Sequence, residues 1–283
     1  MAKPISSSVI TVAFFLLLAC AAAACPPTNY SLILDEQFGA PFHLGDWISD
    51  GNPDCWISHT PYAGDFGDAW FSGFDEPNAE APTTVVPGNI LDIHAYWDGF
   101  RQHWRSGLIA SVDQVGVGFS HAGESYWECL LWWDGTNGTW PAFWLDGGTS
   151  AGFGSQSNTP IAEIDVTEMY GIDPTISHET VHVWLNGNQT YTQNTSTQAA
   201  AGQSYARGWH TFAVWINPTN TIFYIDNNQV WSTPTQPAFL QTLYCMVDLA
   251  LGSGFPDPGI DGVGNGNGNP SHLYVKHIRC WAP

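Results

Sequence analysis

Positive charge is scarce in this 283-residue sequence, which has six Lys and Arg against 26 Asp and Glu and a formal net charge of −20. The six cations are dispersed along the chain, at Lys3, Arg101, Arg105, Arg207, Lys276 and Arg279. Because no basic patch can be built from them, nucleic acid and an anionic membrane surface are poor partners. A strongly anionic polysaccharide would meet a negative field, so a neutral ligand is favoured.

Charged residues are also few overall, at 11% of the chain, whereas aromatic residues reach 14% and include 15 Trp. This composition excludes disorder for most of the sequence. Residues that build long exposed helices are few, and β-branched and aromatic residues are many. The composition therefore predicts an all-β fold, in a chain long enough for one large domain or two small ones.

The first 24 residues resemble a targeting segment. A positive start at residues 1–3 precedes an apolar run at 9–20 and four alanines. This is the pattern of a secretory signal peptide, and the run is short for a membrane span. We therefore expect residues 1–24 to be a signal peptide, residues 25–283 to be one domain, and the protein to be secreted and extracellular. An uncleaved anchor and lipidation of a nearby cysteine stay open.

Export would permit disulfides among the remaining cysteines, at positions 25, 55, 129, 245 and 280. Five is an odd number, so at least one thiol is unpaired within the chain. Chain ends often lie close together, which suggests Cys25–Cys280 as one pairing. Asn-x-Ser/Thr acceptors at Asn29, Asn137, Asn188 and Asn194 matter only in a glycosylating host.

Short apolar runs alternate with Gly, Pro, Asn and Asp, as in a sandwich or barrel. The runs predict strands at residues 30–34, 89–94, 125–133, 142–145, 162–170, 175–185, 209–216, 221–225, 243–251 and 273–281. Asn186-Gly187 and the stretch 226–228 predict turns. The polar segment 194–206 and the Gly-rich segment 252–270 are predicted to be loops.

Three carboxylates lie within six residues of one predicted strand, in the sequence AEIDVTEMYG of residues 162–171. In a regular strand Glu163 and Asp165 share a face and Glu168 points the other way. A one-residue bulge at Val166-Thr167 would return Glu168 to that face. Converging carboxylates have pKa values that are pushed apart, as a retaining glycosidase requires. The alternative is an exposed strand with scattered acids.

Two tryptophans precede this strand. Trp140 and Trp144 are four residues apart, so in a strand they share a face. On a cleft wall such rings stack on sugars, although both could instead belong to the core.

The sequences GTWPAFWL, at residues 138–145, and EIDVTEMYG, at 163–171, closely resemble the signature of glycoside hydrolase family 16 in its bulged E-x-D-x-x-E form. Weaker matches occur in the family's order at residues 34–38, 105–111, 209–226 and 249–254. The resemblance implies a jelly-roll sandwich of two curved antiparallel sheets with a concave substrate cleft. It implies that Glu163 is the nucleophile, Glu168 the general acid/base and Asp165 the carboxylate between them. It also places Trp140 and Trp144 in sugar-stacking positions.

Two positions depart from the family pattern. Leu130 stands where an Arg is frequent, and Lys276 stands where an Asp can ligate a structural calcium. We therefore expect no metal at that place and no cofactor.

The sequence HETVH at residues 178–182 matches the H-E-x-x-H motif of zinc proteases, whose chemistry needs a helix. The β-branched residues around it and the following Asn186-Gly187 predict a strand instead. By the family resemblance, His182 lines the cleft near Glu168. His178 could equally be a structural histidine.

The expected activity is that of a secreted retaining endo-glycosidase on a neutral β-glucan with β-1,3 or mixed β-1,3-1,4 linkages. The expected partner is this neutral polysaccharide, with no nucleic acid, no membrane and a monomeric chain. A β-agarase-like galactan hydrolase is the first alternative. The second is a non-catalytic carbohydrate-binding protein on the same fold.

Overall fold

A computed structural model describes residues 26–40, 42–47, 56–62, 64–72, 81–148, 158–252 and 270–283. The predicted signal peptide, Cys25, Cys55 and nearly all of the loop predicted at 252–270 lie outside these residues. In the part that is described, no helix has the length and apolar character needed to cross a bilayer.

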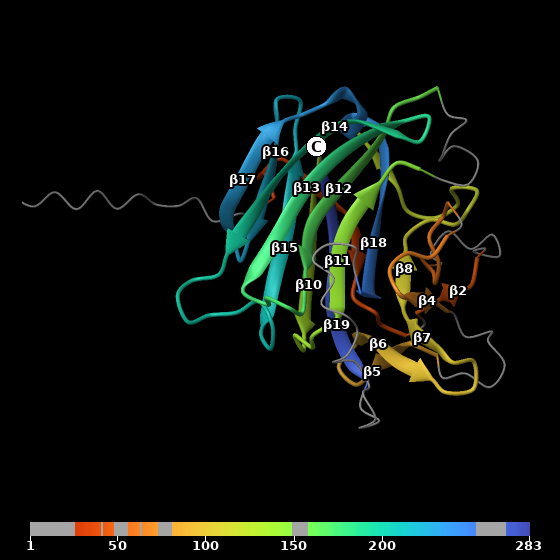
Figure 1. Cartoon of the computed structure of the whole chain (residues 1–283). Coiled ribbons are helices and arrows are strands. Elements are labelled where there is room, and N and C mark those ends of the chain that lie inside the picture. The colour runs from red at the N-terminus through yellow and green to blue at the C-terminus, as the bar shows by residue number, and fades with distance from the viewer. Residues whose placement is uncertain are drawn as a thin grey trace, which may run out of the picture.

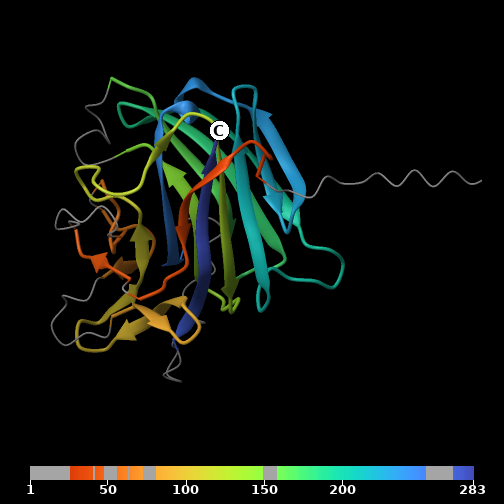
Figure 2. The same cartoon turned by 180° about the vertical axis from the view of Figure 1, so that it is seen from behind.

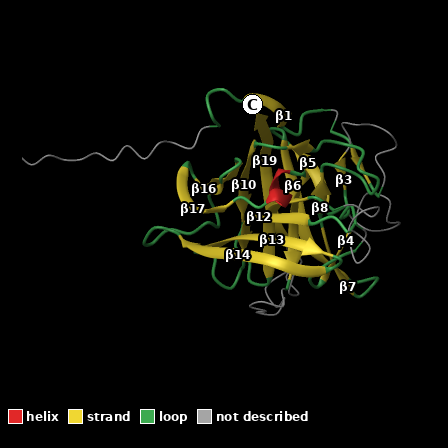
Figure 3. Cartoon of the chain, turned by 90° about the horizontal axis from the view of Figure 1, so that it is seen from above, coloured by secondary structure: helices red, strands yellow, loops and turns green. Residues whose placement is uncertain are grey.

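Two stacked β-sheets form the molecule (Figures 1 and 3). The ten-stranded sheet contains, in spatial order, β17 (Asn228–Pro234), β16 (Asn220–Ile225), β15 (Trp209–Ile216), β10 (Ser125–Trp133), β19 (Ser271–Ala282), β6 (Ile90–Asp98), β7 (His103–Ser106) and β4 (Ala69–Phe71), with β1 (Ser31–Glu36) beside β19 and β5 (Thr83–Val86) beside β6. The nine-stranded sheet contains β14 (Asn188–Gln198), β13 (Ile176–Leu185), β12 (Ile161–Met169), β11 (Thr139–Asp146), β18 (Thr242–Leu251), β8 (Leu108–Ala110), β3 (Trp56–Ile57) and β2 (Leu44–Gly45), with β9 (His121–Ala122) beside β18.

The predicted all-β sandwich is confirmed, with one difference in strand direction. The pairs β2–β3 and β4–β7 are parallel, whereas the long strands pair antiparallel. Seen from behind, β19 and β1 run side by side (Figure 2). The last long strand of the chain therefore lies inside the ten-stranded sheet, between β10 and β6.

The core between the sheets follows the period-two pattern of the strands. Strand β10 buries Trp127, Leu131 and Trp133 against the other sheet, and β12 contributes Ile164 and Val166. The 3-10 helix Pro237–Leu240 adds the fully buried ring of Phe239. These apolar side chains fix one face of β12 against the core, so its polar side chains must face away from it.

Both predicted turns are present. Asn186 and Gly187 join β13 to β14, and Asp226 and Asn227 join β16 to β17. All four residues have positive φ, between 50° and 73°, as the tight hairpin turn requires.

The prediction of a loop at residues 194–206 is wrong for residues 194–198, because β14 continues to Gln198. Its polar sequence gave no core signal, yet every residue from Thr195 to Gln198 pairs with β13. Alternate threonines suit an edge strand with one solvated face, and the neighbouring strand supplies the backbone hydrogen bonds.

The structure has Cys129, Cys245 and Cys280 as free thiols buried in the core. Cys25, the partner suggested for Cys280 by the chain ends, lies outside the described residues. Burial raises the pKa of the Cys245 thiol to about 12, so this group stays protonated and inert at neutral pH.

Gly171, two residues after the end of β12, provides a test of how the strand is anchored. Its amide donates to the Thr139 carbonyl, and a Cβ added at Gly171 would overlap the carbonyl of Thr136. We expect Gly171→Ala to lower the free energy of unfolding by about 1–3 kcal/mol, measured by urea denaturation. Gly99→Ala is the control, because a Cβ there meets no atom within 4 Å. Equal stability of the two variants would contradict this anchoring.

Candidate active site

A bulge in β12 brings three carboxylates to one face of the nine-stranded sheet. Against β11, Thr167 pairs with Phe143 and Asp165 pairs with Trp144, so Val166 is the extra residue. The register against β13 also shifts between Asp165 and Glu168. The bulge predicted at Val166-Thr167 is therefore present.

The three carboxylates line one cavity of about 240 Å³ on the face of β12 that is turned away from the core. Its walls are Tyr62, Phe66, Trp140, Ala142, Trp144, Glu163, Asp165, Glu168 and Asp248. Five of the six site residues expected from the sequence thus meet in one place.

Each carboxylate has its own hydrogen-bond donor or ion pair. The indole Nε1 of Trp184 donates to Glu163 at 2.5 Å, and that of Trp140 donates to Glu168 at 3.0 Å. His182 Nε2 lies 3.4 Å from Asp165 Oδ2. Trp184 lies two residues after His182 on β13, so a period of two puts both on one face, but the sequence alone does not reveal the contact with Glu163.

Burial and crowding shift the pKa values of these acids upward. Burial raises the pKa of Glu168 to about 7, even though the Trp140 hydrogen bond opposes that rise. Burial and the charges of Glu163 and Glu168 raise the pKa of Asp165 well above its usual range. Burial raises the pKa of Glu163 as well, and His182 and Trp184 oppose the rise. Glu168 therefore keeps its proton to a higher pH than an exposed glutamate does.

His182 lies beside the acid cluster, and its direct contact is with Asp165. It pairs in register with Glu163 and contacts Asp165, while His178 is the residue opposite Glu168. Burial lowers the pKa of His182, but the hydrogen bond and charge of Asp165, with Glu163, outweigh it and raise the pKa to about 9. His182 is thus a cation at neutral pH that faces the acid cluster from the edge of the cavity.

The two tryptophans of β11 differ in exposure. Trp140 is half-buried and meets the ring of Phe66 edge-on, with centroids 5.6 Å apart. Trp144 is only 6% exposed, and its indole donates to Asp248 at 2.8 Å. Trp140 is therefore the more exposed ring, whereas Trp144 packs into the apolar cluster beside the cavity. Sugar stacking by either ring stays a prediction.

Four cavity residues had not been identified from the sequence: Tyr62, Phe66, Ala142 and Asp248. Asp248 is fully buried within β18, and burial raises its pKa to about 8. A lone Asp inside the apolar run of residues 246–251 was the available signal. Tyr62 and Phe66 come from an irregular segment that carries no periodic signal.

The H-E-x-x-H sequence lies on strand β13, so the zinc-protease geometry is absent there, as expected. Glu179 faces the core side and accepts hydrogen bonds from Ser177 and Thr197. Glu163, Asp165 and His182 bring one ligand-type atom each within 4.8 Å of one another. However, His182 is protonated at neutral pH, so a metal ion would have to displace that proton before it could bind here.

Calcium does not fit at the position of Lys276. Its ammonium donates to the carbonyl oxygens of Gly88 and Asn89, which are ligands of the kind that calcium prefers. A fixed positive charge therefore stands among the oxygens that would hold the ion.

Comparison with known proteins agrees with this fold and site. Residues 120–248 match the family model described as Glycosyl hydrolases family 16. Endo-1,3-1,4-beta-glycanase EglC of Rhizobium meliloti (strain 1021) is 27% identical over 277 residues, covering 90% of this chain and 54% of EglC. Endo-1,3-1,4-beta-glycanase ExsH of the same strain is 27% identical over 250 residues, covering 88% and 48%.

Two solved structures share the fold across nearly the whole chain. SCLam, a non-specific endo-beta-1,3(4)-glucanase from family GH16, has a TM-score of 0.68 at 20% identity, covering 92% of this chain and 94% of SCLam. The laminarinase catalytic domain from Thermotoga maritima MSB8 has a TM-score of 0.66 at 17% identity, covering 90% and 98%.

The chain thus has a jelly-roll sandwich and carries a family 16 domain. The resemblance to glycoside hydrolase family 16 is thereby confirmed over residues 120–248. The chain spans about half the length of the curated relatives it matches.

The exposures of the two tryptophans predict different stabilities on truncation. Trp144→Ala should lower the free energy of unfolding by about 3–5 kcal/mol, because the ring is buried. Trp140→Ala should cost less, since part of its ring faces the cavity. Urea denaturation of both variants measures the difference. A Trp140→Ala loss as large as that of Trp144→Ala would place both rings in the core.

Proposed function

We propose that this protein is an endo-glycosidase that hydrolyses internal bonds of a neutral β-glucan, with retention of the anomeric configuration. The observation that carries the proposal is the convergence of Glu163, Asp165 and Glu168 in one cavity lined by aromatic rings. The family 16 domain at residues 120–248 and the two curated glycanases support the reaction class.

In the proposed reaction Glu163 attacks the anomeric carbon while Glu168 gives its proton to the leaving glycosidic oxygen. A covalent glycosyl-enzyme results, and the leaving sugar departs with its new hydroxyl. Glu168 then removes a proton from water, which attacks the anomeric carbon and frees Glu163. Each carboxylate ends the cycle in its starting state.

The surroundings of the two glutamates favour these different roles. Glu168 has a pKa raised to about 7, so it keeps its proton in mildly acidic solution, as an acid must. Glu163 accepts the Trp184 indole hydrogen bond and lies next to the cationic His182, which favours its ionised, nucleophilic form. Asp165, between them, is proposed to hold the charge state of Glu163.

Charge and aromatic lining support a neutral glucan as substrate. Trp140 and Phe66 offer apolar ring surface to the C–H faces of sugars. The net charge of −20 disfavours sulfated chains. The fold alone does not select the sugar, because a kappa-carrageenase also shares it, with a TM-score of 0.61 at 15% identity. The names of the curated relatives favour β-1,3 or mixed β-1,3-1,4 linkages over a neutral galactan.

We also propose that the protein is secreted and monomeric. Export is supported by the signal-like residues 1–24 and suits an enzyme whose polymeric substrate stays outside the cell. Release of reducing ends from laminarin, mixed-linkage glucan and agarose tests the substrate directly. Binding to these polymers without any new reducing ends would favour the carbohydrate-binding alternative.

Loss of either glutamate should abolish turnover. We expect Glu163→Ala and Glu168→Ala each to reduce kcat on the polysaccharide by several orders of magnitude while circular dichroism stays unchanged. Azide should restore turnover of an activated glycoside by Glu163→Ala, with inversion at the anomeric centre. Glu179→Gln is the matched control, because this glutamate faces the other side of the adjacent strand. Near-normal activity of Glu163→Ala would refute its role.

The Trp140 hydrogen bond should set the alkaline limit of activity. The bond stabilises ionised Glu168 and lowers its pKa, so Trp140→Phe should raise that pKa. Because the acid must be protonated, the alkaline limb of kcat/KM should move to higher pH. Trp132→Phe, on the other sheet, should leave the limb in place. A shift to lower pH in Trp140→Phe would contradict the acid role of Glu168.

A further inference from the structure

A second cluster of chemically active side chains lies on the ten-stranded sheet, on strands β6 and β19. Leu91 and Ile93 of β6 pack into the core, so Asp92 and His94 project from the opposite face. On β19 the core residue is Leu273, which leaves His272 on that same face. The cavity with the three carboxylates lies on the other sheet.

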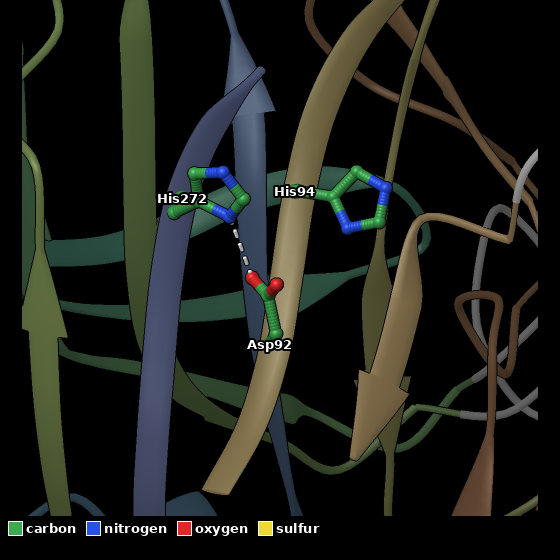
Figure 4. A group of neighbouring side chains, drawn as sticks. All are labelled: Asp92, His94 and His272. Carbon is green, nitrogen blue, oxygen red and sulfur yellow. Dashed lines mark hydrogen bonds and ion pairs between the residues drawn. The ribbon is translucent and has the colours of Figure 1, made fainter. Parts of the chain in front are cut away.

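The register of the two strands brings these three side chains together (Figure 4). His272 pairs directly with His94, and Asp92 is two residues away on β6. The Nδ1 atom of His272 lies 2.8 Å from Asp92 Oδ1, and the two imidazole rings have centroids 5.8 Å apart. One ligand-type atom from each of the three residues lies within 4.8 Å of the others.

Two imidazole nitrogens and one carboxylate oxygen form a donor set typical of zinc and its neighbours in the first transition row. An ion about 2.0–2.2 Å from each donor would need donor atoms roughly 3.3 Å apart in a tetrahedral arrangement. The observed donor atoms lie within 4.8 Å of one another, so an ion would draw these side chains closer together. His272 and Asp92 already contact each other through a hydrogen bond. A metal ion can take the place of the proton in that bond.

The cluster is largely buried, and neighbouring groups hold its side chains in place, as in a binding site. Asp92 and His94 are 8% and 5% exposed, while the His272 side chain is 29% exposed and leaves a path for entry. The backbone amide of His272 donates to Asp134 Oδ2 at 2.8 Å, which fixes the strand and adds a second negative charge nearby. The ring of Tyr274 stacks on His272 at 5.5 Å and 14°, which restricts how the imidazole can turn.

We propose that Asp92, His94 and His272 bind one divalent transition-metal ion, with zinc as the best-matched ion. Three protein ligands leave a fourth position for water. Bound there, the ion joins β6 to β19, and so ties the strand at the centre of the ten-stranded sheet to its neighbour. The site is separate from the proposed catalytic cavity and does not depend on the proposed activity.

Zinc binding to the full chain tests the proposal. Protein stripped with EDTA and dialysed should bind one Zn²⁺ in calorimetric titration, and saturating zinc should raise the thermal midpoint. His94→Gln and His272→Gln should each weaken zinc binding more than the roughly 10–100-fold expected for loss of a partner that merely orients a ligand. Co²⁺ bound to the unmodified protein should give visible bands without a thiolate charge-transfer band, as nitrogen and oxygen ligands require.

Two matched controls separate this cluster from other histidines. His277→Gln removes a histidine–carboxylate pair further along β19, where Nε2 lies 3.0 Å from Glu128, and should leave zinc binding unchanged. His182→Gln removes the histidine beside the three carboxylates and should also leave it unchanged. Zinc binding retained by His94→Gln and His272→Gln, or lost in His182→Gln, would overturn the proposal. So would failure of the unmodified protein to bind zinc at millimolar concentration.

Discussion

One extra residue in β12 determines whether this chain has a site at all. Ile164 and Val166 must stay in the core, because both are fully buried against the other sheet. With strict alternation, Glu168 would then point into that core and bury an unpaired charge, at a cost of several kcal/mol. The bulge at Val166-Thr167 resolves this conflict, since it keeps Val166 inside and turns Glu168 to the face of Glu163 and Asp165.

The same irregularity explains what could and could not be predicted from the sequence. Period-two patterns identify the long strands, and Asn186-Gly187 identifies the hairpin, because each signal is local. The position of His182 depends on the register between β12 and β13, which the bulge shifts and neither strand encodes alone. Strands of two to four residues, such as β3 and β8, are too short to show a period. The burial of the Trp144 ring could not be predicted, because it depends on Phe66 from a segment without regular structure.

Gathering the three acids in a partly closed cavity opposes folding, and the surrounding residues limit that cost without removing the acids' reactivity. Burial raises the pKa of all three acids, so neutral forms are favoured and fewer charges must share the space. Indole donors stabilise the ionised forms of Glu163 and Glu168, but they carry no charge of their own. His182 adds one positive charge at the edge of the cluster, beside Asp165. Glu163 and Glu168 consequently differ in their neighbours, although both are glutamates on one strand.

The shortage of Lys and Arg accounts for this choice of partners across the molecule. With 26 acidic residues and six cations, most carboxylates must find other donors. Indole groups serve Glu36, Glu163, Glu168 and Asp248, and histidines serve Asp46, Asp92, Glu128, Asp165 and Asp226. Indole donors do not titrate, whereas histidines with an unperturbed pKa near 6.5 gain or lose charge with pH. In this protein, histidines are therefore the main partners that can bring a positive charge to a carboxylate. A histidine beside a carboxylate is also the pairing from which transition-metal sites are built.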